Sequence, residues 1–145
     1  MSEELIIRKA THKDKVAIMS LVTAFYGESA PEMVIWWGNN YNQISDKPLI
    51  AQLDNEVIAY IASSTDYESN SVYIGDLYVK PSFRKKGIAT KLVQEVEIIA
   101  ENTHRKLRVD VRKVDQEARK LYKRLGFTLL EEKNKESLKL IKNTK

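Results

Sequence analysis

The chain has 145 residues, a length typical of one domain with a single hydrophobic core. Hydrophobic residues make up 43% of it, and 24 Lys and Arg against 20 Asp and Glu leave a net charge of +4. This composition disfavours intrinsic disorder, and no apolar stretch is long enough for a membrane span. Because there is no cysteine, disulfides, zinc–thiolate sites and cysteine nucleophiles are excluded. The two histidines are too few for a His-rich metal site.

The organisation of the chain is uniform. No repeat, low-complexity tract or Pro/Gly-rich linker divides it, so we expect one domain over residues 1–145. Its acidic start lacks the basic and apolar segments of a secretion signal. We therefore expect a cytoplasmic protein that holds no metal.

The first elements predicted are a strand and two helices. An apolar run at 5–7 predicts an opening strand. Thr11 followed by Asp14 resembles a capping box, and the apolar stripe behind it predicts a helix that ends near Gly27. Pro31 opens a second, shorter helical segment.

Strands follow in the middle of the chain. Residues 48–53 and 57–63 are β-prone runs joined by a turn, and 71–79 predicts a third strand of this hairpin series. A loop rich in cations then leads to an amphipathic segment at 88–101, which predicts a long helix.

The last third of the chain predicts one strand, then a helix, then a pair of strands. Residues 107–112 alternate apolar and charged side chains. Asp115 can cap a helix that ends at Gly126, and 127–130 and 138–141 predict a final strand pair. The order β-α-α-β-β-β-α-β-α-β-β describes a mixed α/β sheet flanked by helices, with one parallel βαβ crossover.

The loop between the 71–79 strand and the 88–101 helix is a candidate anion site. A helix that starts just after a strand directs unsatisfied N–H groups and the positive end of its dipole at whatever lies there. Gly87 allows close approach of a ligand to the backbone. Four cations accompany it, namely Lys80, Arg84, Lys85 and Lys86. The alternative is a solvated basic loop that serves solubility alone.

Two motifs resemble the GNAT superfamily of N-acetyltransferases. The sequence YIGDLYVKPxxRxxGxA, from Tyr73 to Ala89, resembles its acetyl-coenzyme A motif R/Q-x-x-G-x-G/A. The sequence AxxxYxxxGF, from Ala118 to Phe127, resembles a second motif of the family. The resemblance extends from Leu5 to Ile141. It implies a GNAT-like fold in which the central parallel strands, 71–79 and 107–112, splay apart.

The resemblance also implies acetyl-coenzyme A as cosubstrate. Its pantetheine arm and thioester would lie along Leu77, Tyr78 and Val79. The residues implied around its pyrophosphate are Arg84, Lys85, Lys86, Gly87, Ile88, Ala89 and Thr90. Asp115 stands where the family has an Asn on the cofactor arm, although an Asp here also fits a helix cap.

Three residues are candidates for acid–base chemistry. Tyr122 occupies the family's general-acid position, and a phenol keeps its proton at neutral pH; the alternative is a core aromatic. The glutamate that some relatives use as base is replaced by Gly75. Asp76 and Asp110 are the remaining carboxylates nearby, with a water-relayed base as a third option. Asp110 could instead pair with a neighbouring arginine, Arg108 or Arg112.

The acceptor site implied by the resemblance is built by the first two helices and the last strand pair. Aromatic rings beside carboxylates there suit a cationic amine, and the candidates are Tyr26, Glu28, Trp36 and Trp37. The tryptophans could instead fasten the second helix to the sheet.

We therefore expect direct acetyl transfer to a primary amine, most simply a small molecule such as a polyamine or aminoglycoside. Alternatives are a peptide N-terminal or lysine acetyltransferase and a non-catalytic acyl-coenzyme A sensor. A homodimer is a further expectation from the resemblance. Nucleic-acid binding is disfavoured, because the cations are spread along the chain with no stacking platform.

Overall fold

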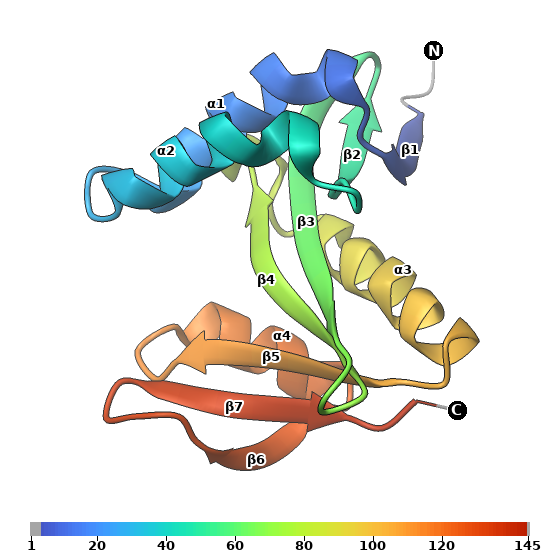
Figure 1. The fold of residues 1–145 in the computed structure, drawn as a ribbon, viewed down its shortest axis with the longest axis vertical. Coiled ribbons are helices and arrows are strands. Elements are labelled where there is room, and N and C mark those ends of the chain that lie inside the picture. The colour runs from blue at the N-terminus through green and yellow to red at the C-terminus, as the bar shows by residue number, and fades with distance from the viewer. Residues whose placement is uncertain (1–3, 145) are drawn as a thin grey trace. The chain divides into compact units, whose positions relative to one another are not determined.

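The computed structural model describes residues 4–144 and has the expected order of elements (Figure 1). The strands are β1 (Leu5–Lys9), β2 (Leu49–Leu53), β3 (Glu56–Asp66), β4 (Ser71–Val79), β5 (Lys106–Arg112), β6 (Thr128–Glu132) and β7 (Ser137–Lys142). The helices are α1 (Lys15–Tyr26), α2 (Pro31–Asn40), α3 (Ile88–Asn102) and α4 (Gln116–Arg124), with short 3-10 turns η1 (His12–Asp14), η2 (Tyr41–Gln43) and η3 (Pro81–Phe83).

The strands form one mixed sheet in the order β1-β2-β3-β4-β5-β7-β6. Only the β4–β5 pair is described as parallel, and its register runs for four residues, from Ser71↔Lys106 to Ile74↔Val109. The mixed α/β class predicted from the sequence is confirmed. None of the helices within residues 4–144 has the length and apolarity to cross a membrane.

The chain contains two compact units. Unit 1 comprises the chain up to Ala62 together with Asp76–Leu92, and unit 2 comprises Ser63–Gly75 together with the chain from Val93 onward. β3, β4 and α3 each contribute residues to both units.

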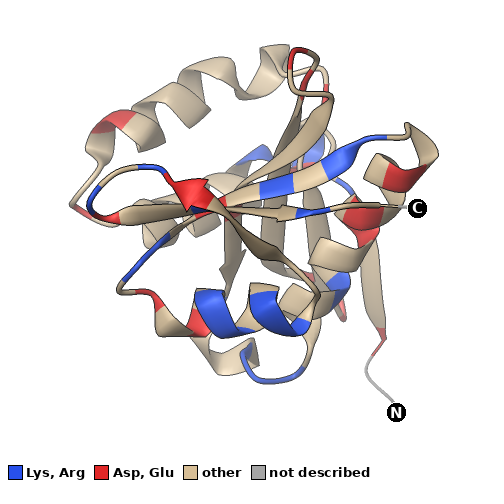
Figure 2. Cartoon of the chain, turned by 90° about the horizontal axis from the view of Figure 1, so that it is seen from below, with Lys and Arg blue, Asp and Glu red and all other residues tan. Residues whose placement is uncertain are grey.

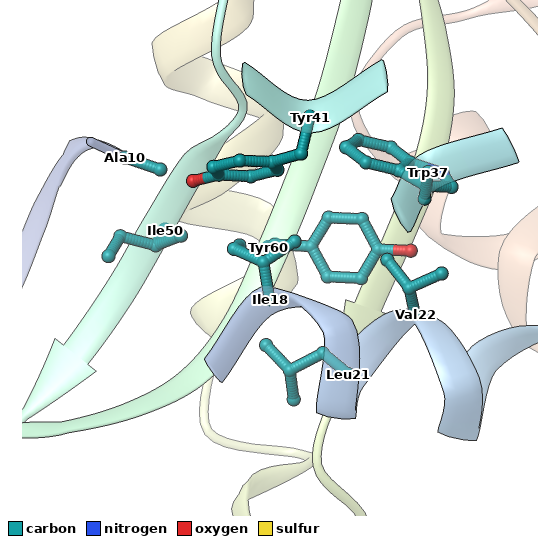
Figure 3. Close-up of a cluster of buried hydrophobic side chains, with 8 residues drawn as sticks. All are labelled: Ala10, Ile18, Leu21, Val22, Trp37, Tyr41, Ile50 and Tyr60. Atoms are coloured by element: carbon teal, nitrogen blue, oxygen red, sulfur yellow. The ribbon is translucent and has the colours of Figure 1, made fainter. Parts of the chain in front are cut away.

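Unit 1 has a core between α1, α2 and the strands β2 and β3. Ile18, Leu21 and Val22 recur at helical spacing on α1 and are almost completely buried, so this stripe forms the contact face of the helix. Figure 3 shows the Tyr60 ring from β3 lying among these side chains, with its hydroxyl directed past Trp37. The core of unit 1 is therefore rich in tyrosine and tryptophan, whose polar atoms need partners.

The start of α1 confirms the predicted capping box. The Thr11 hydroxyl accepts from the Lys13 amide at 3.2 Å, and the Asp14 carboxylate accepts from the Thr11 amide at 2.7 Å. The box lies at the head of η1, one turn before the α-helix itself.

Unit 2 is built on the alternation predicted for β5. Leu107, Val109 and Val111 are buried on one face, and β7 places Leu140 opposite Val109. From α4, Tyr122 packs into the same unit and meets Phe127 edge-on, with ring centroids 5.1 Å apart. Positive and negative side chains are interspersed over helices, strands and loops (Figure 2).

Candidate functional site

A buried carboxylate is held by three aromatic side chains in unit 1. Asp76 on β4 is only 8% exposed. It accepts hydrogen bonds from the Tyr26 hydroxyl at 2.5 Å, the Tyr60 hydroxyl at 3.0 Å and Trp37 Nε1 at 3.1 Å. We call these four residues the Asp76 cluster.

The charge balance of the Asp76 cluster is unusual. All three donors are neutral, and no lysine, arginine or histidine among residues 4–144 forms an ion pair with Asp76. Oδ2 accepts two hydrogen bonds, whereas Oδ1 accepts one and keeps capacity for another. Burying a carboxylate without a counter-charge is costly, so this site is suited to a cation from outside the chain.

The tyrosines of the cluster are held in their protonated form. Burial first, and then the hydrogen bond to Asp76, raise the pKa of Tyr26 above its usual value. Burial and the charge of Asp76 raise the pKa of Tyr60 in the same way. Both hydroxyls therefore remain donors to the carboxylate at any pH near neutral.

Further aromatic rings surround the Asp76 cluster. The Phe25 ring lies edge-on to Tyr26, Tyr60 and Tyr78, at centroid distances of 4.8, 6.4 and 6.0 Å. The Trp37 ring lies edge-on to Tyr60 at 6.0 Å. These edge-on contacts fix the orientation of the rings whose polar atoms donate to Asp76.

The predicted acceptor residues occupy different depths. Trp37 is buried and bonded to Asp76, and Tyr26 is half-buried and reaches the same carboxylate. Trp36 is 48% exposed, and Glu28 is exposed in the turn that follows α1. Sequence reasoning missed Tyr60; the one available signal is that a tyrosine in the middle of an apolar strand needs a partner for its hydroxyl.

The loop before α3 has the free donors expected of an anion site. Within residues 4–144, the backbone amides of Lys85, Lys86 and Gly87 find no acceptor. Gly87 has φ +80° and a Cβ placed there would meet nothing within 4 Å, so the space above this backbone is open. Lys85 also adopts a positive φ of 63°, which turns its amide relative to the next one.

The cations of this loop are partly positioned by the chain. Arg84 Nε donates to the Val79 carbonyl at 2.8 Å, and the guanidinium lies 5.3 Å from the Tyr78 ring centroid. Lys86 lies 5.6 Å from the Phe83 ring centroid. None of Arg84, Lys85 and Lys86 forms an ion pair with a carboxylate of the described residues. A diphosphate would find both backbone donors and uncompensated positive charge here.

The remaining cofactor candidates lie on the elements predicted for them. Leu77, Tyr78 and Val79 form the end of β4, and Ile88, Ala89 and Thr90 form the first turn of α3. Asp115 Oδ1 accepts from the Ala118 amide at 3.0 Å, so Asp115 caps α4. Its contact with a cofactor stays a prediction.

Tyr122 in unit 2 combines burial with an unpaired hydroxyl. The residue is 3% exposed, and its hydroxyl makes no hydrogen bond within residues 4–144. Burial, and to a lesser degree the charge of Asp115, raise the pKa of Tyr122. The side chain is therefore part of the core of unit 2 and also a phenol that keeps its proton.

Asp110 forms an ion pair with a lysine and not with Arg108 or Arg112, the neighbouring arginines considered as its partners. Its Oδ2 accepts from Lys133 Nζ at 2.7 Å, while Arg108 lies over the Tyr73 ring at 4.8 Å. The β6–β7 turn brings Lys133 to the strand, which a contact within β5 alone could not reveal. Oδ1 of Asp110 is buried without a partner in the described residues.

The comparisons with known proteins agree with this geometry. The model of the Acetyltransferase (GNAT) family matches residues 15–127. A thialysine N-epsilon-acetyltransferase of Bos taurus is 34% identical over 68 residues, which are 46% of this chain and 40% of that protein. The matched part is thus less than half of the relative's length.

Solved structures extend the likeness over the whole fold. PaiA N-acetyltransferase from Thermoplasma acidophilum, in complex with coenzyme A, superposes with a TM-score of 0.75 at 21% identity and covers 99% of both chains. An aminoglycoside 6'-acetyltransferase type Ii has a TM-score of 0.80 at 18% identity, covering 95% of this chain and 96% of that one.

The features above converge on one class of protein. No group of three or more His, Asp or Glu side chains within residues 4–144 is placed to hold a metal ion. What these residues do offer is a loop of free amides and cations, a buried carboxylate among aromatic donors, and a protonated phenol. The fold, both sequence motifs and the family match agree: this chain belongs to the GNAT family of acetyltransferases.

Proposed function

We propose that this protein transfers the acetyl group of acetyl-coenzyme A to the primary amine of a small cationic molecule. The proposal rests on Asp76, which is buried, held by three neutral donors, and left without a cation by the described residues. The ammonium group of the acceptor supplies the missing charge.

The loop at the start of α3 holds the coenzyme in this proposal. The amides of Lys85, Lys86 and Gly87 and the first turn of α3 receive the diphosphate, and the side chains of the basic loop neutralise it. When bound, the coenzyme supplies an activated acetyl group as a thioester. The coenzyme-bound neighbour from Thermoplasma acidophilum has the same fold, which supports this assignment.

A pair of glycines allows a matched test of the loop. Gly87 and Gly27 both have positive φ, +80° and +59°, and neither has an atom within 4 Å of an added Cβ. Gly87→Val should weaken coenzyme A binding about tenfold or more, because a β-branched residue resists this backbone and projects into the ligand space. Gly27→Val strains the backbone alone and should leave the affinity unchanged. Equal affinity in both variants would show that the loop does not bind the diphosphate.

The Asp76 cluster recognises the amine and receives its proton. An ammonium group with pKa near 10 must lose a proton before its nitrogen can attack. The half-buried Tyr26 hydroxyl already donates to Asp76, so its oxygen lone pair can accept from the substrate. As the ammonium proton passes to Tyr26, the Tyr26 proton passes to Asp76 Oδ1, and a neutral amine remains.

Unit 2 supplies the remaining roles. Tyr122 acts as the general acid, since burial and the charge of Asp115 raise its pKa and so keep the phenol protonated. Asp110 is the weaker candidate for the base, because the charge of Lys133 already compensates its carboxylate. Leu77, Tyr78 and Val79 at the end of β4 offer backbone groups to the pantetheine arm.

A small acceptor is supported by the chemistry of the Asp76 cluster. One buried carboxylate held by Tyr26, Trp37 and Tyr60 fits a compact alkylammonium group better than a folded protein surface. The bovine relative is named for thialysine and a structural neighbour for aminoglycosides, both small amines. The second candidate function is a coenzyme A-binding sensor, which needs the loop and not Asp76.

Thiol release from acetyl-coenzyme A, measured with a panel of amines, tests the proposal. The panel contains thialysine, lysine, spermidine, an aminoglycoside and a peptide with a free N-terminus. At least one small amine should give saturable turnover, and Asp76→Asn should lower kcat by about 10²- to 10⁴-fold with unchanged coenzyme affinity. Asp54→Asn, at an exposed turn, is the control. Coenzyme binding without turnover favours the sensor, and turnover with the peptide alone rejects a small acceptor.

A further inference from the structure

A groove of about 550 Å3 in unit 2 is not used by the proposed reaction. Its lining residues belong to α4, to the β6–β7 hairpin and to the segment that joins them. Figure 1 shows where these elements lie in the fold. The lining residues are Gln116, Arg119, Lys120, Lys123, Phe127, Thr128, Leu129, Leu138 and Leu140.

The groove lies on a different face of α4 from the apolar stripe. Arg119, Lys120 and Lys123 follow one another at helical spacing on the wall of the groove. Ala118 and Leu125, which share a face with Tyr122, do not line it. The groove is therefore separate from the side of the helix that carries the proposed general acid.

The floor of the groove is apolar. Phe127 and Leu140 are buried beneath it, and Leu129 from β6 is 60% exposed beside them. A large exposed leucine next to buried apolar side chains provides a surface that gains from being covered.

The wall of the groove carries positive charge that the chain does not balance. No carboxylate is among the lining residues, and Lys120 and Lys123 form no ion pair within residues 4–144 (their helix carries the blue bands of Lys and Arg in Figure 2). Arg119 Nη1 donates to the Lys113 carbonyl at 3.0 Å, which fixes the guanidinium without neutralising it.

We propose that this groove binds a small organic anion, namely a carboxylate with an aliphatic or aromatic body. The apolar floor contacts the aliphatic or aromatic part of the ligand. The three cations on α4 pair with its carboxylate, so the charges of the groove and the ligand are complementary. The volume lies within the range of ordinary small-ligand sites. This inference does not depend on the proposed acetyl transfer.

Larger occupants fit the groove less well. A peptide that adds a strand to β6 would meet the irregularity in its pairing between Leu129 and Glu131, which interrupts a regular edge. A symmetric contact between two copies would bring the α4 cations of one protomer close to those of the other. A small anion has neither difficulty.

Dodecanoate, used below its micellar concentration, is the probe for this site. Titration of the full chain by calorimetry should give saturable binding of one molecule per chain, and dodecanol should bind at least about tenfold more weakly. Methyl NMR signals of Leu129, Leu138 and Leu140 should shift on binding. Higher salt should weaken the interaction, because its charged part is partly exposed.

Matched variants separate the groove from general surface charge. The double variant Lys120→Gln, Lys123→Gln should weaken dodecanoate binding about tenfold or more. The control variant Lys106→Gln, Lys135→Gln removes two exposed lysines that do not line the groove, and it should change the dodecanoate affinity less than twofold. Leu129→Asp, at an exposed position, should abolish binding while circular dichroism shows an intact fold.

Several results would overturn the inference. Dodecanol could bind as tightly as dodecanoate, or the two double lysine variants could lose the same dodecanoate affinity. An acidic peptide could bind more tightly than dodecanoate, or dimer formation could compete with dodecanoate binding. Displacement of dodecanoate by coenzyme A would assign the groove to the cofactor site instead. Failure of acetyl transfer with intact dodecanoate binding would reject the proposed function alone.

Discussion

Unit 1 contains two buried aspartates that the chain treats in opposite ways. Asp14 and Asp76 are each 8% exposed. Asp14 accepts two hydrogen bonds of 2.9 Å from the Arg8 guanidinium, and these lower the pKa of Asp14 to about 2. Asp76 accepts only from neutral hydroxyl and indole groups.

The difference separates a carboxylate that is paired within the chain from one that we propose to be functional. The chain provides its own cation and a capping box at Asp14, so that carboxylate completes the start of the first helix. At Asp76 the chain provides orientation and leaves the charge uncompensated. We take the missing cation as the mark of a site meant for a ligand.

Asp14→Asn should cause the largest change in stability. The substitution removes the carboxylate that pairs with Arg8 and leaves the guanidinium with the neutral Gln52 as its side-chain acceptor, so the free energy of unfolding should fall by about 2–3 kcal/mol. Chemical denaturation measures this loss. At a temperature where the variant is folded, kcat should stay within twofold of the parent protein, and a large fall in kcat would end the distinction between the two aspartates.

Tyr26→Phe should lower kcat about tenfold, because it removes the hydroxyl through which the amine proton reaches Asp76. The coenzyme affinity should not change, and the loss should become smaller at high pH, where more of the amine is already neutral. Tyr41→Phe is the matched control, since Tyr41 is a buried tyrosine whose hydroxyl donates to the Thr11 carbonyl. Equal kcat in the two variants would reject the relay.

The stability of the protein should fall in acid because of Asp14. Its pKa is lower in the folded state than in the unfolded chain, so its contribution is complete above about pH 4 and is lost as the pH falls towards 2. Since the Arg8 side chain is 36% exposed and screened by solvent, we expect a loss of about 1 kcal/mol. Urea unfolding at several pH values measures this loss, and Arg8→Met should make it smaller, because the hydrogen bonds from Thr11 still lower the pKa of Asp14.

Asp76→Asn should change stability least, by no more than about 1 kcal/mol in either direction. Removal of an uncompensated buried charge offsets the weaker hydrogen bonds that the amide accepts from Tyr60 and Trp37. Thermal unfolding of the variant beside Asp14→Asn gives the comparison. A loss above 2 kcal/mol would mean that Asp76, like Asp14, is chiefly structural.

Much of the fold could be predicted from the amino-acid sequence alone. The order of elements, the capping box at Thr11, proline at the start of α2 and the cap at Asp115 were all predicted correctly. These features depend on periodicity and on contacts between residues a few positions apart, which sequence displays directly. The cationic loop before α3 belongs to the same class, because its cations and its place directly before a helix are both visible in the sequence.

Contacts between distant residues needed the folded structure. Tyr26, Trp37, Tyr60 and Asp76 come from two helices and two strands, and no local pattern states that their polar atoms meet. The same holds for Lys133, which takes the place of an arginine beside Asp110. Asp14 and Asp76 are equally buried, so tertiary contacts decide which of the two carboxylates has a cationic partner, and such contacts are a property of packing rather than of residue order.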